Sequence, residues 1–358
     1  MRTSITSLSV AAVTLSLLAA APAQADDQQA TPTATPTATP ATGSPAPDAG
    51  HGTGHGGAQP SASTAPLQPR VSAVPRQPQV PAAPQQRSQQ RVQGAAVNKP
   101  VFLVARLSGA NEVPASAGDA DGSGTAIVRV QGNRVTFALD WNGITAPTLG
   151  HIHRGKAGVN GDVAVALFGT AMPATVTQAA GAVTVPDPSI ADGLRLNPGN
   201  WYVNLHTKEN PKGAIRAQLS PLGRRADVLK LLKTGGQRAF MSGDQEVPVK
   251  DGPAVGDPDG RAVAFVRPVT ADKVRFSMAW VGVTPSLGHI HRGRFGTNGP
   301  VTVNLFTTPV PSTIVAVSGV SAPADPKVVQ GIAGNPRNWY ANLHSTEFPG
   351  GAVRGQLN

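Results

Sequence analysis

Histidines are the residues whose spacing in this sequence most directly indicates chemistry. His151 and His153 stand two positions apart, and His206 follows His151 by 55 residues. The same trio recurs 138 residues later, as His289, His291 and His344. Alternate residues of a β-strand project from one face, so each pair would present two imidazoles side by side. Three converging neutral imidazoles suit copper, zinc or another late first-row metal, and the sequence predicts one such site per copy.

Three interpretations of these histidines are open at the level of sequence. The leading one is a non-enzymatic binding protein in which each trio holds a metal or a surface ligand. The second is a mononuclear copper or zinc enzyme, in which an open coordination position activates water or dioxygen. The third is a structural envelope protein without a ligand, in which the imidazoles only form hydrogen bonds. No carboxylate lies within several residues of either histidine pair to act as a base, which favours the first interpretation.

The two copies have diverged unevenly. Across residues 150–156 and 197–206, 14 of 17 positions are identical in the second copy, whereas across residues 157–196 only 14 of 40 are. A constraint from folding alone would preferentially spare apolar positions. The segments that carry the histidines are therefore predicted to have a function beyond the fold.

Polar residues near the histidines follow the two-residue period of a strand. In residues 201–206 tyrosine, asparagine and histidine alternate with apolar side chains, and in residues 214–219 arginine and glutamine do. A hairpin between these segments would bring the polar residues to one face. A shared upstream glutamate either orients a histidine, pairs with the arginine or closes a turn. The polar set expected beside the histidines is Glu112, Asn204, Arg216 and Gln218 in the first copy and Glu246, Asn342, Arg354 and Gln356 in the second.

Short alternating segments follow one another from residue 101 onward, separated by Gly, Pro, Asn and Asp clusters. This series predicts an all-β fold, with an antiparallel sandwich or barrel in each copy. No convincing amphipathic helix is found, apart from a crude apolar stripe at 224–233. The expected strands cover residues 101–107, 125–130, 134–141, 163–168, 201–206 and 214–219, then 262–266, 274–280, 301–306, 339–344 and 352–357.

Composition divides the chain into five parts. Residues 1–25 combine a charged start, a short apolar run and a small-residue end, which is typical of a secretory signal peptide. Residues 26–98 are rich in Pro, Ala and Thr and are expected to form a disordered linker. Residues 99–220 and 237–358 are the two expected domains, and 221–236 is a connector that contains the helical candidate. We therefore expect a secreted or cell-envelope protein with no transmembrane segment in the mature chain.

The chain contains no cysteine and carries a formal net charge of +10. The absence of cysteine excludes disulfides, thiolate chemistry and cysteine-ligated metal sites. The basic balance favours an acidic partner, and we expect an anionic cell-surface polymer or an extracellular protein. The basic residues show no aromatic interleaving and no DNA-binding motif, so specific nucleic-acid binding is not expected.

Several motifs together resemble the CHRD domain family, named from chordin. They are Leu-Ser-Gly-Ala-Asn-Glu-Val-Pro at 107–114, Gly-His-Ile-His-Arg-Gly at 150–155, Asn-Trp-Tyr-Val-Asn-Leu-His-Thr at 200–207 and Gly-x-Ile-Arg-x-Gln-Leu at 213–219. The resemblance covers residues 101–219 and 238–357 and implies two immunoglobulin-like β-sandwiches. In chordin such domains belong to an extracellular antagonist of growth factors, a role not carried over to this cysteine-free chain. Cupins and Cu/Zn superoxide dismutases share the histidine pair but require further ligands that are not found here.

Overall fold

The computed structural model describes residues 98–227, 229 and 234–358. The predicted signal peptide and all but the last residue of the predicted linker lie outside the described residues. So does half of the predicted connector helix at 224–233, namely residues 228 and 230–233. Within the described part of the chain, no helix is both long and apolar enough to span a bilayer.

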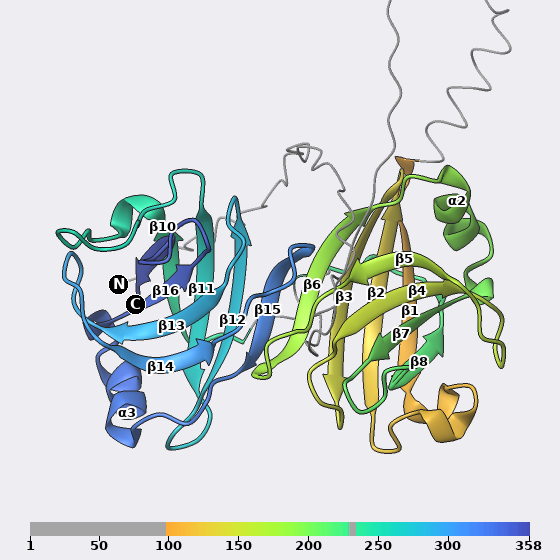
Figure 1. The fold of residues 1–358 in the computed structure, drawn as a ribbon, viewed down its shortest axis with the longest axis horizontal. Helices are drawn as coiled ribbons and strands as arrows, with labels where there is room; N and C mark the ends of the chain where they lie inside the picture. Colours follow the sequence, from red (N-terminus) through yellow and green to blue (C-terminus); the bar gives the residue numbers. More distant parts are fainter. Residues whose placement is uncertain (1–97, 228, 230–233) are drawn as a thin grey trace, which may run out of the picture. The chain divides into compact units, whose positions relative to one another are not determined.

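The first repeat consists of two antiparallel sheets that share a core. One sheet has the order β1-β2-β3-β6 and the other the order β5-β4-β7-β8 (Figure 1). A pairing of Ser108 in β1 with Arg216 in β8 joins the two sheets along one side. The strands are β1 (Val101–Ser108), β2 (Ser123–Gln131), β3 (Arg134–Asn142), β4 (Leu149–Arg154), β5 (Val163–Phe168), β6 (Val176–Thr184), β7 (Trp201–His206), β8 (Ile215–Gln218) and the short β9 (Ser220–Pro221).

The second repeat has the same architecture. Its sheets have the orders β10-β11-β12-β15 and β14-β13-β16-β17. The prediction of an all-β fold with two tandem antiparallel sandwiches is therefore confirmed. The strands are β10 (Gln237–Ser242), β11 (Arg261–Pro268), β12 (Val274–Val281), β13 (Leu287–Arg292), β14 (Val301–Phe306), β15 (Ile314–Val320), β16 (Trp339–His344) and β17 (Val353–Gln356).

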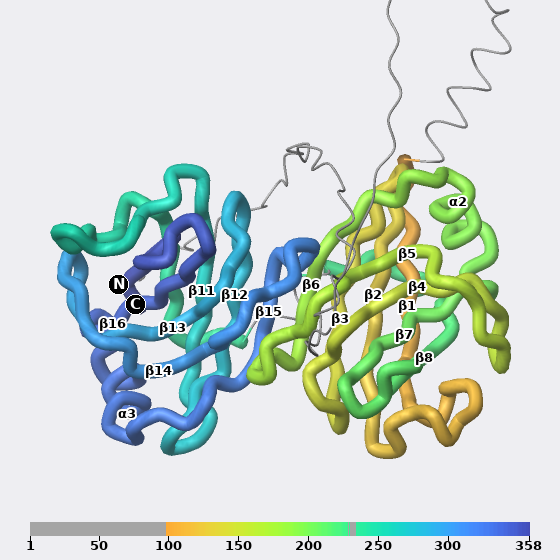
Figure 2. The backbone as a smooth tube through the Cα atoms, viewed as in Figure 1, coloured from red at the N-terminus to blue at the C-terminus, as the bar shows by residue number. Residues whose placement is uncertain are grey.

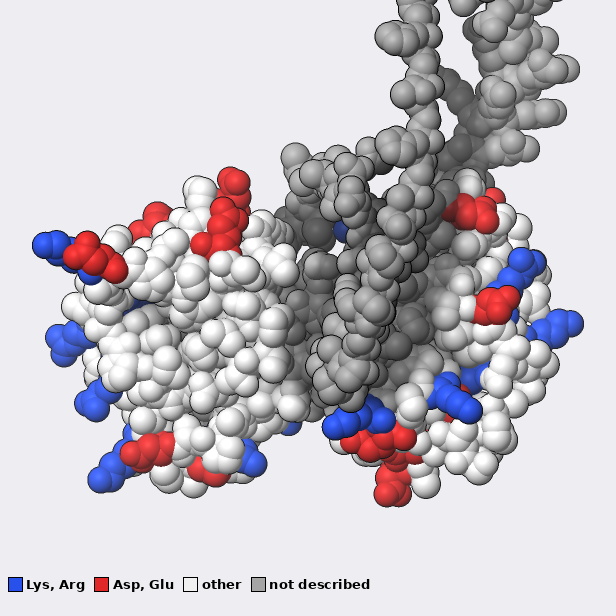
Figure 3. Space-filling view, viewed as in Figure 1, with Lys and Arg blue, Asp and Glu red and all other residues white. Residues whose placement is uncertain are grey.

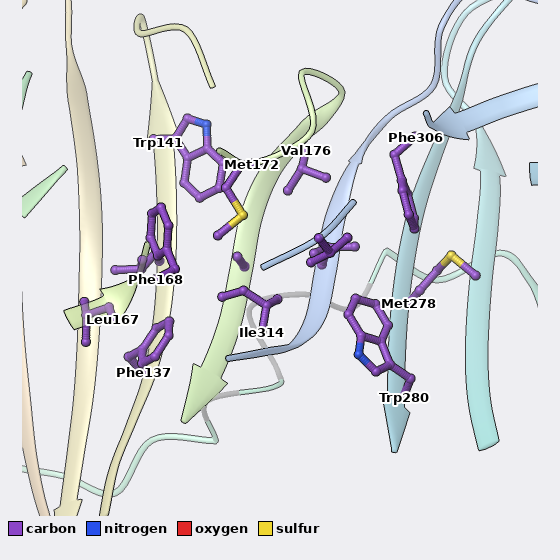
Figure 4. Packing of buried hydrophobic residues seen from close by; sticks show 14 of the residues in the cluster. Phe137, Trp141, Leu167, Phe168, Met172, Val176, Met278, Trp280, Phe306 and Ile314 are labelled. Carbon is purple, nitrogen blue, oxygen red and sulfur yellow. The ribbon is translucent and has the colours of Figure 1, made fainter. Parts of the chain in front are cut away.

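The core forms because each strand turns its alternate apolar residues toward the opposite sheet. Phe137 of β3 packs near Leu167 and Phe168 of β5 (Figure 4), and all three are at most 1% exposed. Burying a side chain of this size contributes about 1.5–3 kcal/mol. The same alternation buries Ile152 between its two histidine neighbours, so the histidines must face the opposite side of β4.

The two repeats are also joined by strand pairing. β6 pairs antiparallel with β15, with Ala180 opposite Ala316. The hydroxyl of Thr175 donates a hydrogen bond to the Leu305 carbonyl at 2.5 Å. Reciprocally, the hydroxyl of Thr313 donates to the Leu167 carbonyl at 2.6 Å. One sheet of each repeat thereby continues into the other.

Two short helices, α2 (Pro188–Leu196) and α3 (Pro326–Gly334), correct the expectation that no amphipathic helix is present outside the connector (Figure 2). Each starts with proline directly after a capping aspartate, Asp187 or Asp325, whose carboxylate accepts a backbone N–H two residues on. Each buries only two apolar side chains, and a central glycine packs against a tryptophan. Nine residues with a glycine in the middle give too little helical periodicity to recognise in the sequence.

Candidate metal centre

The three histidines of the first repeat lie on the outer face of the sheet that contains β4 and β7. His151 is opposite Asn204, His153 is opposite Tyr202, and His206 is opposite the first residue of β4. The three rings therefore converge, with centroids 5.0–6.1 Å apart. The second repeat brings its trio together in the same way, with centroids 5.1–6.2 Å apart.

Backbone carbonyls fix the orientation of two rings in each trio. Nδ1 of His153 donates to the Gly161 carbonyl at 2.9 Å, and Nδ1 of His206 donates to the Pro211 carbonyl at 3.1 Å. Since a carbonyl only accepts, these bonds place the proton on Nδ1 and leave Nε2 with a free lone pair. The corresponding bonds in the second repeat are His291 to Gly299 at 3.0 Å and His344 to Pro349 at 2.9 Å.

The free nitrogens fit a metal ion. Nδ1 of His151 lies 3.2 Å from Nε2 of His206, and the matching distance in the second repeat is 3.3 Å. A tetrahedral ion with metal–nitrogen bonds of 2.0–2.1 Å would hold its ligand atoms about 3.3 Å apart. One ligand nitrogen from each histidine lies within 4.8 Å of the other two. Nε2 of His153 and of His291 is buried with no hydrogen-bond partner in the described structure, as expected for an atom that awaits a ligand.

The environment of the sites favours the neutral form of five of the six imidazoles. Burial, followed by the proximity of the other two histidines, lowers the pKa of His151 and of His289 to about 4. Burial also lowers the pKa of His153, His206 and His291. Neutral imidazole is the form that ligates metals, so protons compete weakly for these nitrogens at neutral pH.

A stack of three planar groups supports one of the ligands. The Arg216 guanidinium carbon lies 3.4 Å from the centroid of the Tyr202 ring. The His153 ring is parallel to the same tyrosine within 5°, at a centroid distance of 4.8 Å. The second repeat forms the same stack from Arg354, Tyr340 and His291, at 3.5 and 4.8 Å. The stack limits rotation of the histidine ring about its side-chain bonds.

The same arginine holds the loop that orients this histidine. Arg216 is only 2% exposed, and it donates to the Val159 carbonyl at 2.6 Å and to Oδ1 of Asn160 at 2.8 Å. Gln218 donates to the Gly155 carbonyl at 2.6 Å, at the start of the loop. These bonds fix residues 155–161, whose last carbonyl accepts the Nδ1 proton of His153. The arginine and glutamine therefore act on the site through the loop, without contacting the ligand position.

Glu112 occupies a different place from that of a metal ligand. It is 6% exposed and accepts a hydrogen bond from Nδ2 of Asn204 at 3.4 Å. Within the described residues it forms no ion pair with Arg216 and no hydrogen bond to a histidine, whereas its backbone N–H closes the turn Gly109–Asn111. Burial raises its pKa to about 7, against the opposing charge of Arg216. Glu246 repeats the bond, to Asn342, and the raised pKa of about 7.

The structure thus brings the six histidines into two trios and gathers the predicted asparagines, arginines and glutamines around them. Sequence reasoning did not include two contributors: the stacked tyrosines and the carbonyls that orient the rings. The tyrosines had a signal, because they lie on the polar face of their strand. The asparagine–glycine pairs at 160–161 and 298–299 also recur in both copies. No signal marked the prolines whose carbonyls hold His206 and His344.

Comparison with known proteins agrees with the motifs and the fold. A family model described as the CHRD domain matches residues 103–219 and 238–357. No curated protein and no solved structure matches the chain. The two matches cover most of the sequence and coincide with the two repeats. The chain belongs to the CHRD domain family and contains two tandem copies of that domain.

Proposed function

We propose that this protein is an exported, non-enzymatic binding protein whose two CHRD domains each hold one copper or zinc ion. The observation that carries the proposal is the pair of buried Nε2 atoms, in His153 and His291, that have no partner while their Nδ1 atoms are engaged. A buried polar atom without a partner costs about 1–3 kcal/mol, and a bound metal would remove that penalty. Three nitrogen ligands without a thiolate suit copper(II) or zinc.

Binding is favoured over catalysis by the groups around the ion. Among the described residues, each metal-ligating cluster consists of three histidines. The buried carboxyl group of Glu112 accepts a hydrogen bond from Asn204, and the exposed Asp162 influences His153 through its charge; among the described residues neither hydrogen-bonds to a histidine. A hydrolytic metal site usually has an acid or base within hydrogen-bond reach of the metal-bound water. We therefore do not favour the copper or zinc enzyme.

Export would place the site outside the cytoplasm. The apolar N-terminal segment and the long Pro-rich stretch support a signal peptide followed by a spacer, and CHRD domains occur in extracellular proteins. We propose a location in the cell envelope or the extracellular space. The basic charge of +10 supports an anionic surface polymer or an acidic extracellular protein as the partner.

Metal content measured by plasma mass spectrometry tests this function. The protein, without its first 25 residues and without a histidine tag, is incubated with copper or zinc and then desalted. We expect two equivalents of metal, and none in a His151→Ala/His289→Ala variant. The matched control is His51→Ala/His55→Ala, which removes the two histidines outside the trios and is expected to keep both equivalents. Failure of the wild-type protein to retain either metal would contradict the proposal.

A further inference from the structure

The second repeat contains a basic surface pocket that the metal site does not use. Its volume is about 570 Å³, and Arg294, Phe295, Arg337, Asn338 and Asn358 are among its lining residues. It is bordered by the loop after β13, by the segment after α3 and by the C-terminus of the described chain. No Asp or Glu lines it, and the terminal carboxylate of Asn358 lies at its border. Lys and Arg side chains project along the outer edge of this domain in Figure 3.

The arginines of this pocket are held in place but keep their charge unpaired. Nε of Arg294 donates to Oδ1 of Asn338 at 3.3 Å. Arg337 is anchored through its backbone, because Gln356 donates to its carbonyl at 2.8 Å. Among the described residues neither guanidinium forms an ion pair. Arg238 does not line the pocket, but its Nε donates to Oδ1 of Asn358 at 3.4 Å.

An aromatic ring lies beside these charges. Phe295 is 70% exposed and Phe240 is 59% exposed, whereas Phe276 and Phe306 of the same domain are at most 1% exposed. Because this ring is exposed to water, it does not contribute the stabilisation that burial of an apolar side chain would provide. Its face carries a partial negative charge that attracts polarised C–H groups. A ligand with an apolar C–H face and an anionic edge would therefore match both the ring and the guanidiniums.

The first repeat provides an internal comparison. It keeps the amide framework, with Asn200 and Gln218 at the positions of Asn338 and Gln356. The positions of Phe295 and Arg337 carry Ala157 and Gly199, and those of Arg294 and Asn358 carry Lys156 and Ser220. The first repeat folds and forms its histidine trio without the aromatic ring or the second arginine. Neither group is therefore required by the fold or by the metal site.

We propose that this pocket binds a carboxylated sugar unit of an anionic polysaccharide, with the carboxylate between Arg294 and Arg337 and the sugar ring on Phe295. Guanidinium groups match carboxylates in a paired, planar geometry. The C–H face of a pyranose ring packs on an aromatic ring in the same way that other apolar surfaces do. The assignment is independent of metal binding, because none of the trio residues lines the pocket.

The test is a binding titration of the intact protein, free of metal, at about 0.15 M salt to screen long-range attraction. The probes are an oligogalacturonate, a neutral galactose oligomer of equal length and a polyphosphate of similar charge. The variant Phe295→Ala/Arg337→Gly installs the residues of the first repeat. Arg267→Gly, at an exposed arginine elsewhere in the second repeat, removes the same charge and serves as the control. Thermal unfolding verifies that each variant folds.

We expect the galacturonate to bind at least about tenfold more tightly than the neutral oligomer, as one charge-assisted contact provides. The double variant is expected to lose at least about tenfold in affinity, and Arg267→Gly less than about twofold. If the double variant and Arg267→Gly lost the same amount of affinity, the effect would be one of net charge, and the proposal would be overturned. The proposal would also be overturned if polyphosphate bound as tightly as galacturonate and Phe295→Ala alone did not weaken that binding. Such a result would show that the sugar ring is not recognised.

Discussion

The two repeats form the same histidine site, but the exposure of the site to solvent differs between them. The distance between the paired histidine nitrogens is 3.2 Å in one and 3.3 Å in the other, and the arginine lies 3.4 and 3.5 Å from its tyrosine ring. In contrast, His289 is buried at 8% exposure, whereas His151 is only half-buried. The distances within the site are therefore nearly the same in the two repeats, whereas the exposure of the first histidine differs.

The two repeats also differ in one loop near the site. Between its shared Val-Pro and Asp residues the second repeat has residues 249–256, where the first has only 115–118. The longer loop forms a bridge between Val255 and Gly351 and accepts the Gly350 N–H at the Ala254 carbonyl, 2.9 Å away. It therefore clamps the turn whose proline carbonyl orients His344. The comparison shows that the anchoring bonds of the histidines are the same in both repeats, whereas this loop differs in length.

The largest expected effect separates the two sites. His206→Ala should remove one metal equivalent and leave the second repeat loaded, and His344→Ala should do the reverse. Loss of one of three protein ligands should lower the affinity of the affected site by more than about 100-fold, beyond the 10–100-fold typical of residues behind the ligands. Competition with a calibrated chelator measures both sites. Loss of both equivalents from a single substitution would show that the sites are coupled and would break the comparison.

Replacement of the buried arginine should have the next largest effect. Arg216→Lys keeps the charge but not the planar fork, so several acceptors in residues 155–161 lose their donor. We expect a loss of about 2–3 kcal/mol in the free energy of unfolding and about tenfold weaker metal binding in the first repeat only. Urea unfolding and metal titration measure the two effects. Arg134→Lys, at an exposed position, should change stability by less than about 0.5 kcal/mol. A loss of stability without weaker metal binding would contradict the positioning role.

Buried glutamates should make stability depend on pH in a specific direction. The pKa of Glu112 rises from the ordinary 4.5 to about 7, so between these values the native state holds a proton that the unfolded chain has released. Its contribution is complete below pH 4.5 and is lost as the pH rises to about 7, at most about 3 kcal/mol. Five of the trio histidines have lowered pKa values and act in the opposite direction, so a variant is needed to isolate the glutamate.

Glu112→Gln/Glu246→Gln supplies that comparison. Between pH 5 and pH 8 the wild-type protein should lose part of its free energy of unfolding, and the neutral amides should remove this loss. Urea unfolding of the metal-free protein measures the effect. Single substitutions should each remove about half of the effect, because both carboxyl groups have a pKa raised to about 7. If the free energy of unfolding changed with pH in the same way in the wild type and the double variant, the prediction would be contradicted. The carboxyl groups would then be better solvated than their burial implies.

The sequence predicted the histidine faces because period-two alternation is a local property. It did not reveal β6, which has a run of Ala and Gly, or β15, which is apolar on both faces; neither strand has a contrast between its faces. Their burial comes from pairing with each other and from a small alanine cluster of Ala138, Ala180 and Ala316. The role of Arg216 could not be predicted either, because the loop that it anchors has no periodicity and lies about 60 residues away in the chain. Contacts of this kind are determined by the tertiary fold alone.

The smallest expected effect concerns the loop that differs between the repeats. Replacement of residues 249–256 by the shorter Ala-Ser-Ala-Gly segment of the first repeat should expose His289 and leave the anchoring bonds of Arg354 in place. We therefore expect the metal affinity of the second site to change by less than about tenfold, which is below the range of about 10–100-fold typical of residues behind the ligands. Its rate of metal release to a chelator should rise to that of the first site. Stopped-flow measurements on the His206→Ala background, in which only the second site is loaded, isolate this rate. If the rate of metal release stayed unchanged, the slower release from the second site would be due to its ligands. Accessibility to solvent would then not explain the difference between the repeats.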